Sequence, residues 1–395
     1  MVKFAHLADC HLGSWRQQEL QNLNFKSFQK VVDRSIKESV DFILIAGDLF
    51  DSAYPPIEIL KETFSEFKKI KEAGIPVYLI AGSHDFSASG KTFLDVLEKG
   101  GFCKNVENVE EQEDGRLKLT PTFFKDIAIF GYPGRKSGME IEDLKKVYFD
   151  SVYPYTIFMI HTTISDVVGT IPMDSVDKLK LPLANYYAMG HIHQRFLKRE
   201  GNATYSYPGP IYPNNFQELT DLNYGSFNLC SLENGNLSVE NILIELEEVV
   251  TKEIFLDSGL TATDKIISEI DRLNLTNKIF LLKLKGVLKE GKTGDIRFGE
   301  IEDFVSKKGA TVFLRNISSV KLLENGVELT TGDMENIEEK ILEEYSRKNP
   351  ADFNKYLPSL MQTLSIEKNE DEKNLIYENR LISELKTILN LEEIL

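Results

Sequence analysis

Short apolar runs alternate with amphipathic stretches along the first part of the chain. Strands are predicted at Lys3–Ala8, Asp41–Ala46 and Pro76–Ala81, and the run at Asp41–Ala46 is typical of a strand buried on both faces. Helices are predicted at Asn24–Glu38 and Pro56–Glu72, where apolar residues recur at helical spacing. This strand–helix–strand–helix order predicts parallel strands joined by right-handed crossovers.

The pattern changes twice further along the chain. Later strands are predicted at Ile127–Tyr132, Thr156–Ile160, Tyr186–Met189 and Thr204–Tyr207, and a hairpin around Asn234-Gly235 within Ser226–Leu246. From Glu247 a small α+β module follows, with strands at Lys252–Leu256, Lys278–Lys285 and Thr311–Asn316 and helices at Thr263–Leu273 and Ile301–Lys308. After Thr330 helices are predicted at Asp333–Arg347, Pro350–Leu364 and Asp371–Leu389. We therefore expect three domains, at residues 1–246, 247–325 and 330–395.

Composition describes an ordinary globular protein. The 395 residues suit two or three domains, and 42% hydrophobic with 27% charged residues is a common balance. No apolar run of about 18 residues predicts a membrane span, and the first residues lack the features of a secretory signal. Cys10, Cys103 and Cys230 are odd in number and far apart, which argues against a disulfide framework or a zinc ribbon. A reducing cytoplasm is therefore expected.

The net charge of −16 argues against a protein that grips nucleic acid passively, because such binders present a basic surface. Two factors weaken this objection. Bound divalent cations would offset carboxylates locally, and a partner could supply basic surface.

Histidine placement indicates a site. Of six histidines, His6 lies inside a predicted strand and is expected to be structural, whereas the other five follow apolar runs. The carboxyl ends of parallel strands face one crevice, so these residues should meet at one edge. Asp9 and His11 are two apart, and an extended segment would turn both side chains to the same face. The remaining candidates follow later strands: Asp48, Ser83, His84, Asp85, His161, His191 and His193.

The candidate side chains favour a particular chemistry. Mixed histidine and aspartate ligands without thiolates suit Mn, Fe, Zn or Ni better than a structural zinc. Two ions about 3.5–4 Å apart can bridge a hydroxide and clamp a phosphoryl group for in-line attack. Phosphodiester hydrolysis benefits because its transition state spreads negative charge over the non-bridging oxygens.

The order D-x-H, G-D, G-[N/S]-H-D, H and G-H-x-H is similar to that of calcineurin-like metallophosphoesterases. Three segments narrow the resemblance to the Mre-eleven/SbcD DNA double-strand-break repair nucleases, in their archaeal type. They are Asp9-Cys10-His11-Leu12-Gly13, Gly47-Asp48-Leu49-Phe50-Asp51 with Pro55 and Pro56, and Tyr207-Pro208-Gly209 with Phe216 and Glu218. The resemblance covers Met1 to about Leu246.

The resemblance implies a role for each matching residue. One ion would be held by Asp9, His11, Asp48 and His193, and the other by Asp48, His161 and His191, with Asp48 bridging. His84 would not be a ligand but would stabilise the transition state or protonate the leaving oxygen. Asp85 would orient His84 or its turn.

The resemblance also implies a fold, an activity and partners. The fold would be a four-layer α/β/β/α sandwich with a small α+β cap and a helical C-terminal segment. The activity would be Mn²⁺-dependent 3′-to-5′ exonuclease action on duplex DNA ends and endonuclease action on single strands or hairpins. Family members form homodimers and pair with an ABC-type ATPase that carries a long coiled coil.

Three positions depart from the family pattern. Ser83 stands where an asparagine ligand is usual, and its shorter hydroxyl would bind the second ion directly, act through a water, or only shape the turn. We therefore predict looser binding of the second ion. Asp51 stands where many relatives carry histidine, and Pro210 where serine is usual.

Several alternatives stay open. The chain is either a DNA nuclease, a phosphoesterase for small phosphodiesters or phosphomonoesters, or a non-catalytic assembly subunit with a degraded second metal site. Arg195, Lys198 and Arg199 either contact DNA phosphates or lie in a solvated loop. The terminal helices either form a plain bundle or dock on the ATPase through an apolar stripe at Leu375, Ile382, Leu385 and Leu389.

Overall fold

The computed structural model describes residues 1–86, 92–150, 152–168, 174–323, 342–343, 345–347, 349–366, 368 and 374–389. Two compact units make up the chain, Met1–Lys321 and Leu322–Leu395. The expected domain boundary near residue 246 falls inside the first unit and stays a prediction. Among the described residues, every helix is too short or too polar to span a membrane.

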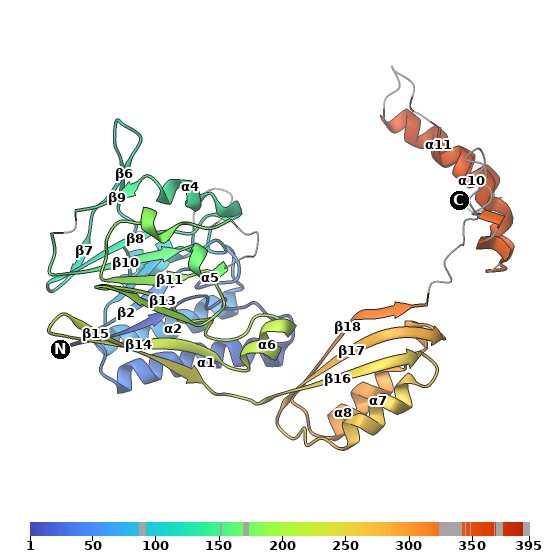
Figure 1. The fold of residues 1–395 in the computed structure, drawn as a ribbon, viewed down its shortest axis with the longest axis horizontal. Coiled ribbons are helices and arrows are strands. Elements are labelled where there is room, and N and C mark those ends of the chain that lie inside the picture. Colours follow the sequence, from blue (N-terminus) through green and yellow to red (C-terminus); the bar gives the residue numbers. More distant parts are fainter. Residues whose placement is uncertain are drawn as a thin grey trace. The chain divides into compact units, whose positions relative to one another are not determined.

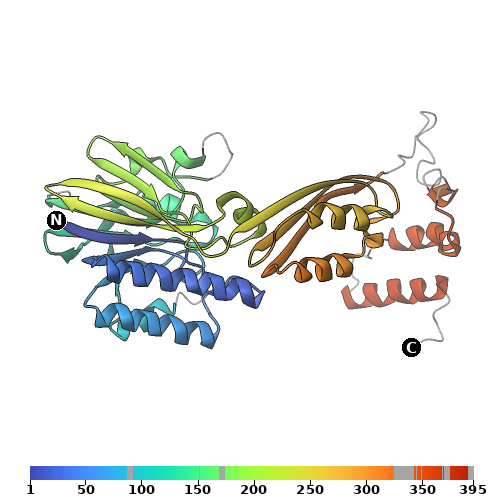
Figure 2. The ribbon, with the colours of Figure 1, turned by 90° about the horizontal axis from the view of Figure 1, so that it is seen from below.

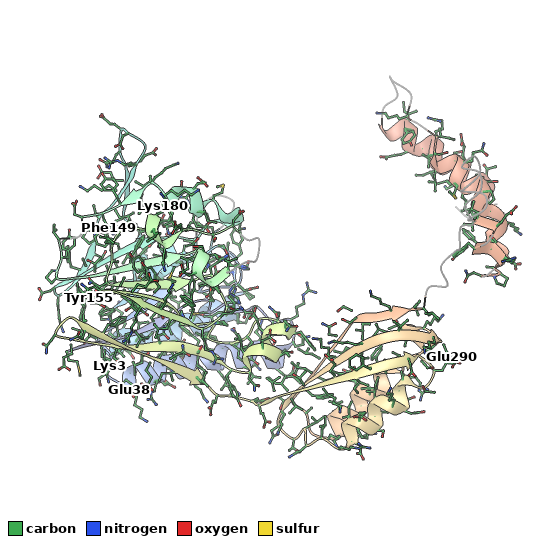
Figure 3. All side chains as sticks on the ribbon, in the orientation of Figure 1. Lys3, Glu38, Phe149, Tyr155, Lys180 and Glu290 are labelled. Carbon is green, nitrogen blue, oxygen red and sulfur yellow. The ribbon has the colours of Figure 1, made fainter. Side chains whose placement is uncertain are left out.

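The first sheet has six strands in the order β15-β14-β1-β2-β3-β4. Its parallel strands are β1 (Val2–Leu7), β2 (Phe42–Ala46), β3 (Val77–Ile80) and β4 (Lys104–Asn105). The predicted hairpin is present as β14 (Gly225–Glu233) and β15 (Asn236–Ile244), and β14 pairs antiparallel with β1. Its helices are α1 (Gln18–Lys37), α2 (Ile57–Glu72) and α3 (Leu94–Lys99). An ion pair of 3.1 Å between Lys3 and Glu38 ties β1 to the end of α1 (Figure 3).

The second sheet has the order β12-β13-β11-β10-β8-β7. Four strands run parallel at its centre, β8 (Ile127–Tyr132), β10 (Tyr155–His161), β11 (Tyr186–Gly190) and β13 (Ala203–Tyr207). The antiparallel edges are β7 (Thr122–Phe124) and β12 (Phe196–Glu200). A separate small sheet is formed by β5 (Val109–Glu111), β6 (Leu117–Leu119) and β9 (Val147–Tyr148). Short helices connect these strands: η1 (Lys136–Gly138), α4 (Glu140–Leu144), α5 (Ser165–Val168), η2 (Lys178–Lys180) and α6 (Phe216–Leu222).

Alternating side chains of the two sheets build three apolar layers. Helices α1 and α2 cover one face of the first sheet (Figure 2), and Phe28 and Phe67 belong to the apolar cluster formed there. The opposite face, with Phe42, packs against Ile157 of the second sheet. The outer face of the second sheet is covered in part by the short helix α4 and the segments around it. The predicted four-layer α/β/β/α sandwich is therefore confirmed.

The predicted α+β module forms a three-stranded sheet with helices on one face (Figure 1). Its strands are β16 (Val249–Ser258), β17 (Ile279–Glu290) and β18 (Val312–Leu322), and its helices are α7 (Ala262–Asp271), η3 (Thr293–Asp295) and α8 (Phe298–Lys307). We call this module, residues 247–322, the cap. The other face of its sheet packs, through Ile279, Leu281 and Val312, against Leu20 and Leu219 of the sandwich.

The second unit contains η5 (Asp352–Tyr356), α10 (Leu357–Leu364) and α11 (Asn374–Ile388), and α10 packs against α11. Two of the predicted terminal helices are therefore present. Most of the third, Asp333–Arg347, lies outside the described residues, as does the side chain of Leu375. Ile382 of the predicted stripe is 50% exposed.

Some boundaries differ from the prediction for identifiable reasons. Helix α1 begins at Gln18 rather than Asn24, because the polar turn before Asn24 also carries the buried Leu20 and Leu23. The strands β4 to β7 and β9 were not predicted, since two or three residues are too few to show a period. Lys198 and Arg199 lie on the edge strand β12, so the alternative that placed them in a solvated loop is wrong, while contact with DNA phosphates stays a prediction.

Candidate metal centre

The candidate residues come from both sheets of the sandwich. Asp9 follows β1, Asp48 follows β2 and His84 follows β3, all in the first sheet. In the second sheet, His161 is the last residue of β10, while His191 and His193 follow β11. The candidate residues therefore lie at the carboxyl ends of strands from both sheets, and not at one edge of a single sheet.

Three overlapping groups bring ligand atoms within 4.8 Å of one another: Asp9, His11 and His193; Asp9, Asp48 and His161; and His11, Asp48 and His84. Asp9 and Asp48 are almost fully buried, with 0% and 2% exposure. Burying ionised carboxylates is costly unless a cation accompanies them. Asp9, His11 and Asp48 each belong to two of these groups, so the three groups form one continuous centre.

The backbone around the ligands is not extended. Asp9, His11 and Asp48 have φ values of 51°, 42° and 50°, so the expected strand-like alternation of Asp9 and His11 is wrong. Aspartate and histidine tolerate this left-handed region better than most residues, although such strain still costs on the order of 1–3 kcal/mol each. The side chains converge because the loop curls, and Asn24 holds the curl by donating to the Cys10 carbonyl at 2.9 Å.

Glycines make room for two of the ligands. A Cβ on Gly47, whose φ is +88°, would lie 2.2 Å from Nδ1 of His161. A Cβ on Gly82 would lie 2.2 Å from Oδ1 of Asp48. The glycines of the G-D and G-S-H-D segments thus allow His161 and Asp48 to approach the neighbouring backbone closely.

Each of three histidines is oriented by a hydrogen bond from Nδ1. His161 donates to the Ala46 carbonyl at 2.9 Å, His11 to Asp51 Oδ1 at 3.1 Å, and His193 to Glu218 Oε1 at 3.0 Å. Such bonds set the tautomer and leave Nε2 as the ligand nitrogen. This arrangement is typical of histidines that bind metal.

The donor atoms fit a divalent cation. Nε2 of His11 lies 3.2 Å from Nε2 of His193, and two lone pairs at that distance require a cation or a proton between them. Nε2 of His161 is buried and lies 3.1 Å from Asp48 Oδ2, without a hydrogen bond of good geometry. This set of nitrogen and oxygen donors matches the preferences of Mn, Fe, Zn or Ni.

Electrostatics around Asp48 and His161 favour a positive charge. Burial alone would lower the pKa of His161, but the carboxylates of Asp48 and Asp9 raise it to about 10. Burial alone would raise the pKa of Asp48, but His161 and His11 hold it well below its usual range. Without metal, a proton on His161 therefore balances Asp48, and a metal ion would displace this proton.

Ser83 and His191 lie beside Asp48 and His161. The Ser83 hydroxyl donates to Asp48 Oδ2 at 3.5 Å, and the His191 ring lies 5.2 Å from the His161 ring. Partial burial and the charge of His161 lower the pKa of His191 to about 4, which keeps its imidazole neutral. Among the described residues, the three groups consist of histidines and carboxylates alone, and His191 belongs to none of them.

His84 stands at the surface of the centre. Its side chain is 48% exposed, and its ring lies 4.7 Å from that of His11. Nδ1 donates to the Asp51 carbonyl at 2.8 Å, while the backbone N–H donates to Asp48 Oδ1 at 2.8 Å. These bonds leave Nε2 as the nitrogen available to a bound phosphate.

Asp85 holds the turn rather than the His84 ring. Its carboxylate accepts backbone N–H bonds from Gly82 at 2.8 Å and Phe50 at 3.1 Å, which ties the two loops together. Burial and the nearby Asp48 carboxylate raise the pKa of Asp85 to about 7.

Arg195, Lys198 and His6 have their partners outside the metal centre. Arg195 donates to the carbonyls of Leu222 and Tyr224 at 3.0 and 3.2 Å, and Lys198 pairs with Asp166 and with Glu200. Nδ1 of the buried His6 lies 2.8 Å from the Tyr186 hydroxyl, and burial lowers the pKa of His6 to about 3. Asn24 was missed as a supporting residue, although an asparagine on the apolar face of a helix is a usable signal.

Comparisons with known proteins show which proteins this chain resembles. The calcineurin-like phosphoesterase family matches residues 2–195. The DNA double-strand break repair protein Mre11 of Methanococcus maripaludis is 30% identical over 266 residues, which cover 62% of this chain and 69% of the relative. The protein of the same name from Archaeoglobus fulgidus is 26% identical over 377 residues, covering 85% and 82%. Among solved structures, a dimetal phosphatase from Danio rerio aligns with a TM-score of 0.39 at 11% identity, covering 62% of this chain and 98% of that one.

Proposed function

This chain belongs to the Mre11 (Mre-eleven/SbcD) family of calcineurin-like phosphoesterases, and on that premise we propose that it hydrolyses DNA phosphodiester bonds with two Mn²⁺ ions. It is a metal-dependent phosphodiesterase. The proposed actions are 3′-to-5′ removal of nucleotides from duplex ends and endonuclease cleavage of single strands or hairpins, inside the cell.

One observation supports the proposal most strongly: three histidines and two buried aspartates converge, and each of the three histidines has its second nitrogen fixed. Asp9, His11, Asp48 and His193 would hold one ion, and Asp48, His161 and His191 the other. Bound there, the ions would supply Lewis-acid stabilisation of the phosphoryl group and a hydroxide nucleophile at neutral pH.

The chain's own residues would do the rest. Ala46, Asp51 and Glu218 keep the ligand histidines in the tautomer that leaves Nε2 free. His84, anchored by the Asp51 carbonyl, would place Nε2 beside the scissile phosphate and give a proton to the leaving oxygen.

Cleavage of end-labelled duplex DNA tests the proposed substrate. We expect Mn²⁺-dependent release of nucleotides from the 3′ end, abolished by a chelator and restored by excess Mn²⁺. A generic chromogenic diester is assayed alongside. Turnover of that diester without cleavage of duplex DNA would instead favour the small-molecule phosphoesterase, and no turnover of either would favour the non-catalytic subunit.

Ser83 gives a prediction about the second ion. Its hydroxyl contacts Asp48 Oδ2 at 3.5 Å and is shorter than the amide found in relatives. Ser83→Asn is therefore expected to tighten binding of one of the two Mn²⁺ ions, as measured by isothermal titration calorimetry. Equal Mn²⁺ affinities in the variant and the parent would contradict this prediction.

The partners are proposed from family membership. We propose a homodimer that works with a coiled-coil ABC-type ATPase, bound by the helices of residues 330–395. Half-exposed apolar side chains on α11, such as Ile382, favour docking over a self-contained bundle. A partner would also supply positive surface to a chain whose net charge is −16.

A further inference from the structure

We infer that helix α6 couples the packing of the cap to the metal ligand His193, with Glu218 as the positioning residue. The inference rests on the proposed metal site and concerns only its Asp9, His11 and His193 side. It predicts that a change in the cap contact, remote from the ligands, alters the affinity for one of two metal ions.

Glu218 is a fixed partner for His193. It lies in the first turn of α6, where Asn215 caps its backbone N–H at 2.9 Å. Its Oε1 accepts from His193 Nδ1 at 3.0 Å, and its Oε2 accepts from the backbone N–H of Asn214 at 2.8 Å. Because both oxygens of the Glu218 carboxylate accept hydrogen bonds, the carboxylate has little freedom to move on its own. The position of α6 therefore sets the position of the His193 ring.

The other end of α6 is bound to the same segment of chain. Arg195, two residues after His193, donates to the carbonyls of Leu222 and Tyr224 at the end of the helix. The segment His193–Arg195 is therefore clamped at both ends of a single short helix. A shift of α6 would move His193 as a unit with it.

The helix also contacts the cap at two points. Asn223, at the C-terminal end of α6, has φ of 66°, and its Oδ1 accepts from the backbone N–H of Val249 in β16 at 3.2 Å. Leu219 is fully buried in the apolar cluster that contains Leu281 and Val312 of the cap sheet. Helix α6 therefore contacts the cap through one hydrogen bond and through one apolar side chain.

The other side of the metal centre has separate supports. His161 is held by the Ala46 carbonyl of β2, and Asp48 accepts from the backbone N–H of His84. These supports belong to the central strands and the loops that follow them. The affinity for one ion should therefore depend on the contact between α6 and the cap, while the affinity for the other ion should not.

Asn223→Gly tests the coupling with little backbone strain. Glycine accepts a positive φ, so the variant removes only the side-chain bond to Val249. We expect one of the two Mn²⁺ dissociation constants of the full chain to rise about 2- to 10-fold, the equivalent of one hydrogen bond, and the other to stay unchanged. Asn234→Gly is the matched control, since Asn234 also has positive φ, 52°, but lies in the exposed β14–β15 turn.

Glu218 variants show whether the effect passes through this residue. Glu218→Ala should weaken the same ion about 10- to 100-fold. Glu218→Gln keeps one acceptor for His193 but loses the acceptor for the Asn214 backbone N–H, so it should recover part of that loss. Adding Asn223→Gly to Glu218→Ala should produce no further loss, because the connection is already broken.

The outcomes separate the two proposals. An unchanged pair of dissociation constants in Asn223→Gly, or losses that simply add in the double variant, would overturn the coupling while leaving the metal site intact. Failure of the parent chain to bind Mn²⁺ at all would instead overturn the proposed function. Thermal unfolding of each variant, measured without metal, excludes loss of the fold as the cause.

Discussion

Replacing His84 with alanine is expected to slow cleavage of DNA about 10²- to 10⁴-fold, which is the usual contribution of a positioned general acid. The side chain is 48% exposed, whereas Asp9, Asp48 and His161 are buried, and the Asp51 carbonyl fixes its Nδ1. Nε2 is therefore presented to a substrate rather than to the protein interior. Single-turnover cleavage of end-labelled duplex with saturating Mn²⁺ measures the chemical step.

Metal binding by the same variant decides between two roles for His84. Its ring nitrogen lies within 4.8 Å of ligand atoms of His11 and Asp48, so proximity alone does not separate an acid from a ligand. We expect two Mn²⁺ ions to bind His84→Ala with affinities close to those of the parent. Loss of an ion would make His84 a ligand, and an unchanged cleavage rate would remove it from the mechanism.

Asp48→Asn is expected to weaken both ions and to lower cleavage by about 10³-fold or more, since a metal contributes several kcal/mol to the transition state. Asp48 Oδ2 faces His161 at 3.1 Å and His11 at 3.7 Å, which places one carboxylate between the two halves of the centre. Asparagine keeps an oxygen for the His84 backbone N–H, so the turn should survive. Calorimetric titration with Mn²⁺ gives the stoichiometry and the affinities.

Asp41→Asn is the matched control, because Asp41 immediately precedes β2 at the end away from the centre. It should retain two ions and the parent's cleavage rate. Two tightly bound ions in Asp48→Asn would contradict the bridging role, even if cleavage were reduced.

The architecture was largely predictable because buried parallel strands leave continuous apolar runs. The predicted strands of the sandwich begin and end within one residue of their observed positions, except that the hairpin ends at Ile244 rather than Leu246. The cap strands β17 and β18 extend several residues beyond the prediction, since their exposed ends carry polar residues that break the apolar signal.

The site was predictable as a set of residues but not as a geometry. The motif order places Asp9 and His11 together, yet extended backbone was the wrong reason, because both adopt positive φ. Such curvature depends on tertiary supports like Asn24, whose partners cannot be inferred from spacing. Asp51 departs from the family pattern, yet its side chain orients His11 and its carbonyl orients His84.

Anomalous diffraction from crystals grown with Mn²⁺ tests the two-metal centre most directly. A two-metal centre predicts two anomalous peaks about 3.5–4 Å apart, with Asp48 between them. One peak should contact Asp9, His11 and His193, and the other His161 and His191. A single peak, or two peaks that do not share Asp48, would contradict it.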